Sequence, residues 1–190
     1  MNVAYMKEKL GNEFGFMAED TDKVIKQLNI NKDGKILDIG TGSGSLAIIL
    51  ALNGYQVITG EPEDDDSAYA KQDWQGNAQK VGVDHLIEFK AFNAGDMPFE
   101  DDTFTAILSL GAFHHIEEDQ RTKAIEECLR ISTIEAPICF FEPNKNSIKF
   151  IQKNDPSHPG VTDPSEYIQG LNLNSQKIPG NIFDAFIFRK

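Results

Sequence analysis

Apolar and polar residues alternate along the chain in blocks that predict strands and helices in turn. Short apolar runs predict five strands, at Lys35–Ile39, Tyr55–Thr59, Leu86–Ala91, Phe104–Leu110 and Ala136–Phe141. Stretches with helical spacing predict helices at Thr21–Leu28, Ser45–Asn53, Ser67–Val81 and Asp119–Ile131. Because strands alternate with helices, the pattern indicates a parallel sheet with helices on both faces.

The last fifty or so residues are less regular. They predict a short helix near Pro164–Gly170, followed by antiparallel strands at Leu173–Ile178 and Ile182–Arg189. The tripeptide Pro179–Asn181 supplies the turn between these strands. The expected fold is therefore α/β, Rossmann-like and doubly wound, with a seven-stranded, mostly parallel sheet that contains one antiparallel strand.

The chain reads as one domain of 190 residues. We divide it into an N-terminal helical segment (1–30), a central core (35–143) and a C-terminal part with a helix and antiparallel strands (144–190). Cys128 and Cys139 lie in apolar stretches, which is typical of buried thiols that form neither a disulfide nor a metal site.

Composition narrows the class of partner. The net charge is −12, and the 18 Lys and Arg residues are scattered, which argues against a nucleic-acid partner and favours a small-molecule substrate. No apolar run reaches the length of a membrane span, and the first residues lack the pattern of a secretory signal. We expect a cytoplasmic protein without a membrane partner, present as a monomer or homodimer.

Three glycines follow the first predicted strand at alternate positions, Gly40, Gly42 and Gly44. Glycines allow a sharp turn at the end of the strand and a close approach of a ligand just before a helix N-terminus. The same stretch also satisfies the dinucleotide pattern G-x-G-x-x-A. The glycines alone therefore leave the identity of the cofactor open.

Two acidic residues near the glycines narrow the choice. Asp38 lies inside the first strand, where a buried carboxylate is costly unless it accepts hydrogen bonds or meets a positive ligand. Glu61 follows the second strand, at a position from which an acidic side chain can bind both hydroxyls of a ribose.

The segment Ile36–Gly44 resembles the first motif of the class I S-adenosylmethionine-dependent methyltransferases, in particular the small-molecule branch that includes ubiquinone and menaquinone methyltransferases. A second stretch, Asn93–Phe104, is similar to that family's D-A-x-x-L-P-F-x-D-x-x-F motif. It leads into Ala106–Ile116, which resembles the family's fourth strand and its His-His-Ile ending.

This resemblance implies S-adenosylmethionine as the cofactor and a methyl group as the group transferred. Asp38 and the turn would surround the methionine part, Glu61 would bind the ribose, and Pro62 would cover one adenine face. Asn93 replaces the family's usual Asp beside the adenine amino group, so its bond would lack charge. The expected cofactor-binding set is Asp38, Gly40, Thr41, Gly42, Ser43, Gly44, Glu61, Pro62, Asn93, Ala94 and Leu110.

His114 and His115 are the candidate catalytic residues, because they end the fourth strand at the edge where open α/β sheets bind ligands. A histidine near neutrality can deprotonate a hydroxyl or amine before methyl transfer. The alternative is structural, with one histidine capping the next helix and the other packed on the sheet. Glu142 and His158 are placed at the mouth in structural roles, and no metal ligand is assigned.

Three alternatives stay open at this point. Residues 5–18 are hypothesised to form part of a substrate lid; the alternative is that they pack on the core as an ordinary helix. A nicotinamide-dependent oxidoreductase is disfavoured, because Asp38 precedes the glycines and no suitably placed Tyr-x-x-x-Lys pair is present. A non-catalytic S-adenosylmethionine-binding regulator is a credible alternative, because of Asn93 and the absence of the family's Lys-Pro-Gly-Gly turn before the fifth strand.

Overall fold

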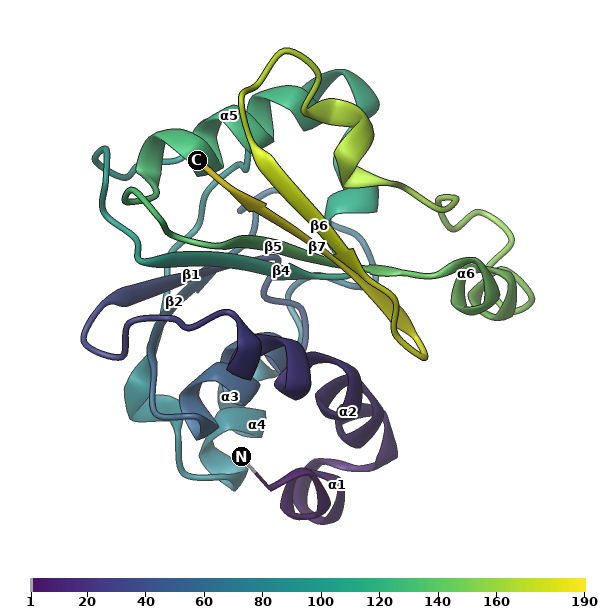
Figure 1. Ribbon diagram of the computed structural model, residues 1–190. Coiled ribbons are helices and arrows are strands. Elements are labelled where there is room, and N and C mark those ends of the chain that lie inside the picture. The colour runs from purple at the N-terminus through teal and green to yellow at the C-terminus, as the bar shows by residue number, and fades with distance from the viewer. Residues whose placement is uncertain (1) are drawn as a thin grey trace.

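The computed structural model describes residues 2–190, which form a seven-stranded sheet flanked by helices (Figure 1). The strands are β1 (Lys35–Ile39), β2 (Gln56–Gly60), β3 (Ile87–Phe89), β4 (Ala106–Leu110), β5 (Ile138–Pro143), β6 (Asn174–Ile178) and β7 (Phe183–Arg189). The α-helices are α1 (Val3–Leu10), α2 (Asn12–Gln27), α3 (Ser45–Leu52), α4 (Trp74–Lys80), α5 (Arg121–Ile131) and α6 (Lys145–Ile151). Short 3-10 helices occur at Asp84–Leu86, Phe113–His115, Glu118–Gln120 and Pro164–Tyr167.

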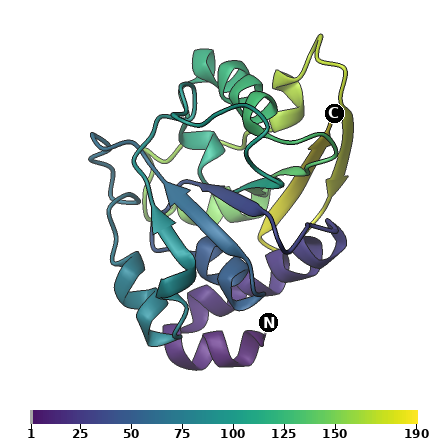
Figure 2. The same cartoon turned by 90° about the vertical axis from the view of Figure 1, so that its left-hand side faces the viewer.

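The strand order in the sheet is β3-β2-β1-β4-β5-β7-β6. Strands β1 to β5 are parallel, and β7 runs antiparallel to both of its neighbours. The predicted mostly parallel sheet with one antiparallel strand is thereby confirmed. The yellow β6 and β7 lie at the opposite end of the sheet from β2 and β3 (Figure 2). Because strand order reverses between β1 and β4, a crevice for ligands is expected at their carboxyl ends.

Two apolar clusters hold the helices on the two faces of the sheet. Helices α1 to α4 lie on one face and α5 on the other (Figure 1). The first cluster includes Ile25 and Ile48, which are almost fully buried. The second includes Phe104, Ile125 and Phe140. Each such side chain contributes about 1.5–3 kcal/mol through burial, so both faces are firmly attached.

The N-terminal helical segment is longer than predicted. In place of one helix at Thr21–Leu28, α2 begins at Asn12 and α1 precedes it. Met6, Phe14 and Ala18 are buried in the first core cluster, and this tertiary packing extends the helical region beyond what the local sequence indicates.

The predicted helix Ser67–Val81 is wrong in its first half, because α4 begins only at Trp74. The Asp73 side chain accepts a hydrogen bond from Gly76 N at 2.9 Å and caps this later start. Lys71 has φ +54°, a left-handed conformation that interrupts any helix through it. Helix α6, in contrast, was not predicted at all.

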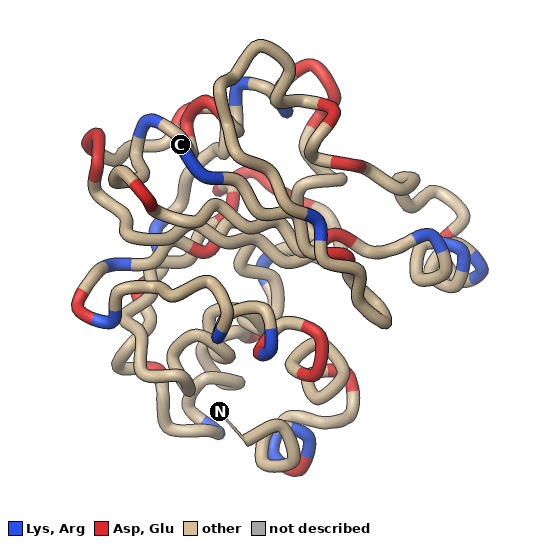
Figure 3. The backbone as a smooth tube through the Cα atoms, viewed as in Figure 1, with Lys and Arg blue, Asp and Glu red and all other residues tan. Residues whose placement is uncertain are grey.

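Charged residues are spread over many elements, as the sequence suggests. Figure 3 shows Lys and Arg dispersed along the chain, with one group on α6 that includes Lys145 and Lys149. The remaining basic positions do not form a stripe along one helix.

Among residues 2–190, no helix combines the length and the apolar composition that crossing a bilayer requires.

Candidate functional site

The residues predicted to form the site gather at the carboxyl edge of the central strands. The glycine turn follows β1, Glu61 follows β2, and Asn93 lies beyond β3. The two candidate histidines follow β4, next to β1 in the sheet. The parallel sheet therefore brings together groups that are far apart in the sequence.

The glycine turn needs residues without side chains at Gly40 and Gly42. Their φ angles are +90° and +47°, in the left-handed region that other residues rarely adopt. A Cβ on Gly40 would overlap the side chain of Ala112, and a Cβ on Gly42 would lie 3.2 Å from the carbonyl oxygen of Tyr69. The turn thus passes closely beneath two other segments before α3 begins at Ser45.

Asp38 is fully buried in β1, beside this turn. The Thr59 hydroxyl donates to Asp38 Oδ2 at 2.8 Å, whereas nothing within residues 2–190 makes a hydrogen bond with Oδ1. Burial raises the pKa of Asp38 from 3.8 to about 8, and nearby Glu61 raises it further, whereas the Thr59 hydroxyl and the backbone amide of Ala47 lower it. A buried carboxyl with an unused oxygen fits a site that receives a positively charged ligand group.

The raised pKa of Asp38 has a consequence for stability. Because the folded-state pKa of about 8 exceeds the unfolded value near 3.8, protonation stabilises the fold fully at acid pH. This contribution is lost as pH rises through 8. We expect the free energy of unfolding of the wild type, relative to Asp38→Asn, to fall between pH 5 and pH 8 in urea titrations. If the difference in unfolding free energy between the wild type and Asp38→Asn did not change with pH, the pKa of Asp38 would not be raised. Asp33→Asn, at an exposed position, is the control.

Glu61 is buried at the end of β2 and already binds two backbone amides. Gly42 N donates to Glu61 Oε2 at 2.9 Å, and Lys71 N donates to Oε1 at 2.7 Å. The carboxylate is therefore directed at the glycine turn. Its two oxygens can accept a pair of hydroxyls if Lys71 N moves away.

Pro62 and Asn93 both line a surface hollow with a volume of about 240 Å³. Phe92 also borders this hollow. The Asn93 side-chain oxygen accepts a hydrogen bond from Gly95 N at 2.9 Å. A carbonyl oxygen has two lone pairs, so it can still accept a second donor. Asp96 and Asn93 are both exposed, but only Asn93 lines the hollow, which favours Asn93 over Asp96 as the adenine partner.

Four other predicted residues lie around this framework. Thr41 is buried, and its hydroxyl is 3.0 Å from that of Thr59. The hydroxyl of Ser43 is hydrogen-bonded to that of Ser45 at 2.9 Å. Ala94 is buried in the second core cluster, and Leu110 packs, half-buried, against the first. Of these, Thr41 extends the polar group around Asp38.

Residues 63–73, which we call the covering segment, lie across the site. Within it, Tyr69 has its carbonyl oxygen against Gly42, and its hydroxyl donates to Asp155 at 2.9 Å. The Tyr69 ring contacts those of His115 and His158, with centroids 5.2 and 5.5 Å away. The covering segment thus spans the distance between the glycine turn and the histidines.

His114 and Glu142 form a buried pair. Their side chains are joined by a 2.6 Å contact between His114 Nδ1 and Glu142 Oε2. The backbone amides of Phe113 and His114 also donate to this carboxylate, at 3.1 and 3.2 Å. Because an ionised carboxylate only accepts, His114 Nδ1 carries the proton and Nε2 is directed elsewhere.

His115 and His158 complete a compact group with His114. The ring centroids of His115 and His114 are 4.2 Å apart, and His158 lies 5.1 Å from each. Burial lowers the pKa of His115 to about 4, assisted by the two other imidazoles and opposed by Asp65 and Asp155. His115 is therefore a neutral imidazole at physiological pH.

Sequence reasoning missed Thr59 and Tyr69. The sequence does carry a signal for Thr59, because it is a polar residue in an apolar strand and pairs in register with Asp38. Tyr69 carries none, because its place depends on the contact with Asp155, far along the chain.

Comparison with known proteins identifies relatives of this chain. Residues 37–141 match the model of a family described as a methyltransferase domain. An uncharacterised methyltransferase of Staphylococcus carnosus is 26% identical over 68% of this chain and 57% of its own length. A demethylmenaquinone methyltransferase of Clavibacter sepedonicus is 26% identical over 51% of this chain and 36% of its own. The chain thus spans about half the length of these curated relatives, or less.

The fold is also similar to that of a solved structure. The crystal structure of an S-adenosylmethionine-dependent methyltransferase from Aquifex aeolicus superimposes with a TM-score of 0.70, at 18% identity and over the whole of both chains. At this identity the likeness concerns the fold. The family match covers more than half of the chain and includes Asp38, the glycine turn, Glu61 and Asn93. The chain therefore belongs to the methyltransferase domain family, in which S-adenosylmethionine is the methyl donor.

Proposed function

We propose that this protein transfers a methyl group from S-adenosylmethionine to a small-molecule acceptor. The observation that carries the proposal is the pair of buried carboxyls, Asp38 and Glu61, on either side of the glycine turn. Asp38 offers an unused oxygen to a cationic group, and Glu61 offers two oxygens to a pair of hydroxyls. S-adenosylmethionine carries both kinds of group.

In this proposal, the parts of the cofactor follow the edge of the sheet. Asp38 and residues 40–44 surround the methionine part, with Thr41 and Ser43 supplying hydroxyls. Glu61 binds the ribose. Pro62 and Asn93 hold the adenine in the hollow that they line, and Ala94 and Leu110 complete the apolar wall. The dinucleotide alternative lacks comparable support, since a nicotinamide cofactor gives Asp38 no cationic partner beside the turn.

Cofactor binding requires a local change in the covering segment. Lys71 N occupies the Glu61 oxygen that a ribose hydroxyl would use. The Tyr69 carbonyl lies directly over Gly42. We propose that these two contacts open when the cofactor enters, while the bond between Gly42 N and Glu61 is kept.

The bound sulfonium supplies an electrophilic methyl group, so the protein's tasks are to align the acceptor and exclude water. His114 and His115 are proposed as the catalytic residues, because they follow β4 at the same edge of the sheet. Glu142 fixes the ring of His114 through Nδ1, which leaves Nε2 to receive a proton from the acceptor. Tyr69 covers the rings from the other side.

The N-terminal segment has a more limited role than a detachable lid. Met6 and Phe14 belong to the core, so deletion of residues 5–18 would remove part of the fold. Phe16 is 45% exposed, and the Lys7 ammonium lies 4.5 Å from the centre of its ring. The hypothesis that residues 5–18 cover the substrate therefore stays a proposal.

Asn93→Asp is expected to tighten S-adenosylmethionine binding by about fivefold. An ionised acceptor forms a hydrogen bond to the adenine amino group that is stronger than a neutral one by about 1 kcal/mol. Isothermal titration calorimetry measures the change, with Asn174→Asp on the exposed strand β6 as the control. Unchanged or weaker binding would remove Asn93 from the adenine site.

The function itself is tested with S-adenosylmethionine labelled in its methyl group and a panel of small phenols, quinols, carboxylates and amines. Transfer of label to one chemical class, with release of S-adenosylhomocysteine, is the expected result. Tight cofactor binding without methyl transfer to any compound of the panel would favour the alternative of a non-catalytic S-adenosylmethionine-binding regulator.

A further inference from the structure

Three of the chain's four histidines converge on one point. One ring nitrogen from each of His114, His115 and His158 lies within 4.8 Å of the other two. His114 and His115 come from the 3-10 helix after β4, whereas His158 lies in the irregular segment after α6. Only the tertiary fold brings the third ring to the other two.

The ring of His114 is positioned with an unused lone pair. Its Nδ1 donates to Glu142, so Nε2 is the acceptor nitrogen. His114 is 3% exposed, and no atom in residues 2–190 makes a hydrogen bond with Nε2. An unpaired buried acceptor of this kind costs about 1–3 kcal/mol unless something binds it.

The ring of His158 is also oriented by a hydrogen bond at Nδ1. It is 6% exposed, and its Nδ1 lies 3.0 Å from the backbone carbonyl oxygen of Pro159. A carbonyl oxygen only accepts, so Nδ1 carries the proton and Nε2 is again the free nitrogen. Histidines that bind metals are typically oriented in this way, with the second nitrogen donating to a carboxylate or a backbone carbonyl.

We propose that His114, His115 and His158 bind a divalent transition-metal ion, with Zn²⁺ as the test ion. Neutral imidazoles are the ligands that such ions prefer, and three of them leave a fourth position open. Tetrahedral ligation at 2.0–2.1 Å places ligand nitrogens about 3.3 Å apart, so the rings must draw together by about 1.5 Å at most. His115 is exposed and His158 lies in a loop, so both can make this adjustment.

Charge and position support this assignment. The carboxylates of Asp65 and Asp155 act on His115 electrostatically and oppose the effects of burial and of the two other imidazoles, so they are the charges here that attract a cation. The open position lies on the edge of the sheet that carries the glycine turn. Resting on the proposed methyl transfer, we further infer an acceptor with a hydroxyl oxygen. The metal would bind this oxygen and lower the pKa of the hydroxyl, whose proton would pass to water. With the metal bound, His114 Nε2 would be a ligand, and its role as proton acceptor would belong only to the metal-free chain.

The test is calorimetric titration of the metal-stripped full chain with ZnCl₂, without S-adenosylmethionine. We expect one Zn²⁺ per chain, and a loss of affinity of more than about 100-fold in His115→Ala and in His158→Ala. Glu142→Gln should weaken binding about 10- to 100-fold, because it removes the charge that orients His114. Co²⁺ should give the visible absorption of a tetrahedral ion in the wild type but not in His115→Ala or His158→Ala.

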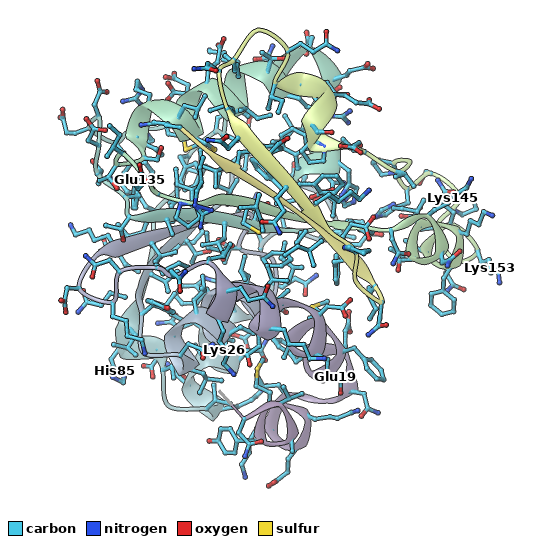
Figure 4. The ribbon with its side chains drawn as sticks, in the orientation of Figure 1. Glu19, Lys26, His85, Glu135, Lys145 and Lys153 are labelled. Carbon is cyan, nitrogen blue, oxygen red and sulfur yellow. The ribbon has the colours of Figure 1, made fainter. Side chains whose placement is uncertain are left out.

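His85→Ala is the matched control. His85 is the remaining histidine, is exposed, and lies at the left of Figure 4, on the other side of the molecule from Lys153, which closely precedes His158 in the sequence. This variant should bind Zn²⁺ as the wild type does. Thermal unfolding shows whether each variant is folded. If His158→Ala does not fold, the Zn²⁺ affinity of His115→Ala decides the result, because His115 is exposed.

Equal Zn²⁺ affinity in the wild type and His115→Ala would overturn the proposal, as would loss of binding in His85→Ala. Because the titration contains no cofactor or acceptor, it is independent of methyl transfer. Zn²⁺ binding without any methyl transfer would refute the proposed function and leave the metal site standing. Methyl transfer by a chain that binds no Zn²⁺ would refute the metal site and leave the proposed function standing.

Discussion

Replacing Gly42 with valine is expected to abolish measurable binding of S-adenosylmethionine while the chain remains folded. The new Cβ would lie 3.2 Å from the Tyr69 carbonyl oxygen, and the γ carbons would fill the space that the proposal gives to the methionine part of the cofactor. The φ of +47° adds about 1–2 kcal/mol of strain, which a domain of ordinary stability tolerates. Calorimetry measures the affinity, and thermal unfolding measures the fold.

Gly54→Val is the control for backbone strain. Gly54 also has a positive φ, +86°, but a Cβ there has no neighbour within 4 Å, and it follows the opposite end of α3. We expect a comparable loss of stability with unchanged cofactor affinity. If the Gly42 and Gly54 variants bound the cofactor equally well, the turn would not be the cofactor site.

Glu61→Ala is expected to weaken binding of both S-adenosylmethionine and S-adenosylhomocysteine by about 100-fold. Two hydrogen bonds from hydroxyls to an ionised carboxylate contribute about 3 kcal/mol together, which corresponds to that factor. Glu126→Ala is the matched control, because Glu126 is exposed on α5 and has the same charge. Similar affinities in these two variants would mean that the ribose lies elsewhere.

The local parts of the fold could be predicted because the sequence determines them over short distances. The strand Lys35–Ile39 was predicted with the bounds that the structure shows, and the turn after it follows from its glycines. Asp38 and Glu61 were also placed correctly at the edge of the sheet, since each is fixed by its position relative to a strand.

The covering segment could not be predicted, because long-range contacts determine its path. Propensity favoured a helix from Ser67, but the bonds from Lys71 N to Glu61 and from the Tyr69 hydroxyl to Asp155 hold the chain across the site. Helix α6 escaped prediction for a different reason, since its seven residues are too few to establish a helical period.

The histidine cluster shows the same limit at the site. His114 and His115 are adjacent in the sequence, and a pair alone gives no metal pattern. The third histidine comes from a segment without regular structure, so no spacing rule connects it to the pair. Tertiary structure also gives Glu142 its role, because the carboxylate on β5 meets the backbone amides of Phe113 and His114.

The central claim is that S-adenosylmethionine binds beside Asp38, the glycine turn and Glu61. Calorimetric titration of the unmodified chain with S-adenosylmethionine, S-adenosylhomocysteine and NADH tests it directly. We predict one binding site per chain for each of the first two ligands and no heat of binding for NADH. Binding of NADH without binding of the other two would contradict the claim.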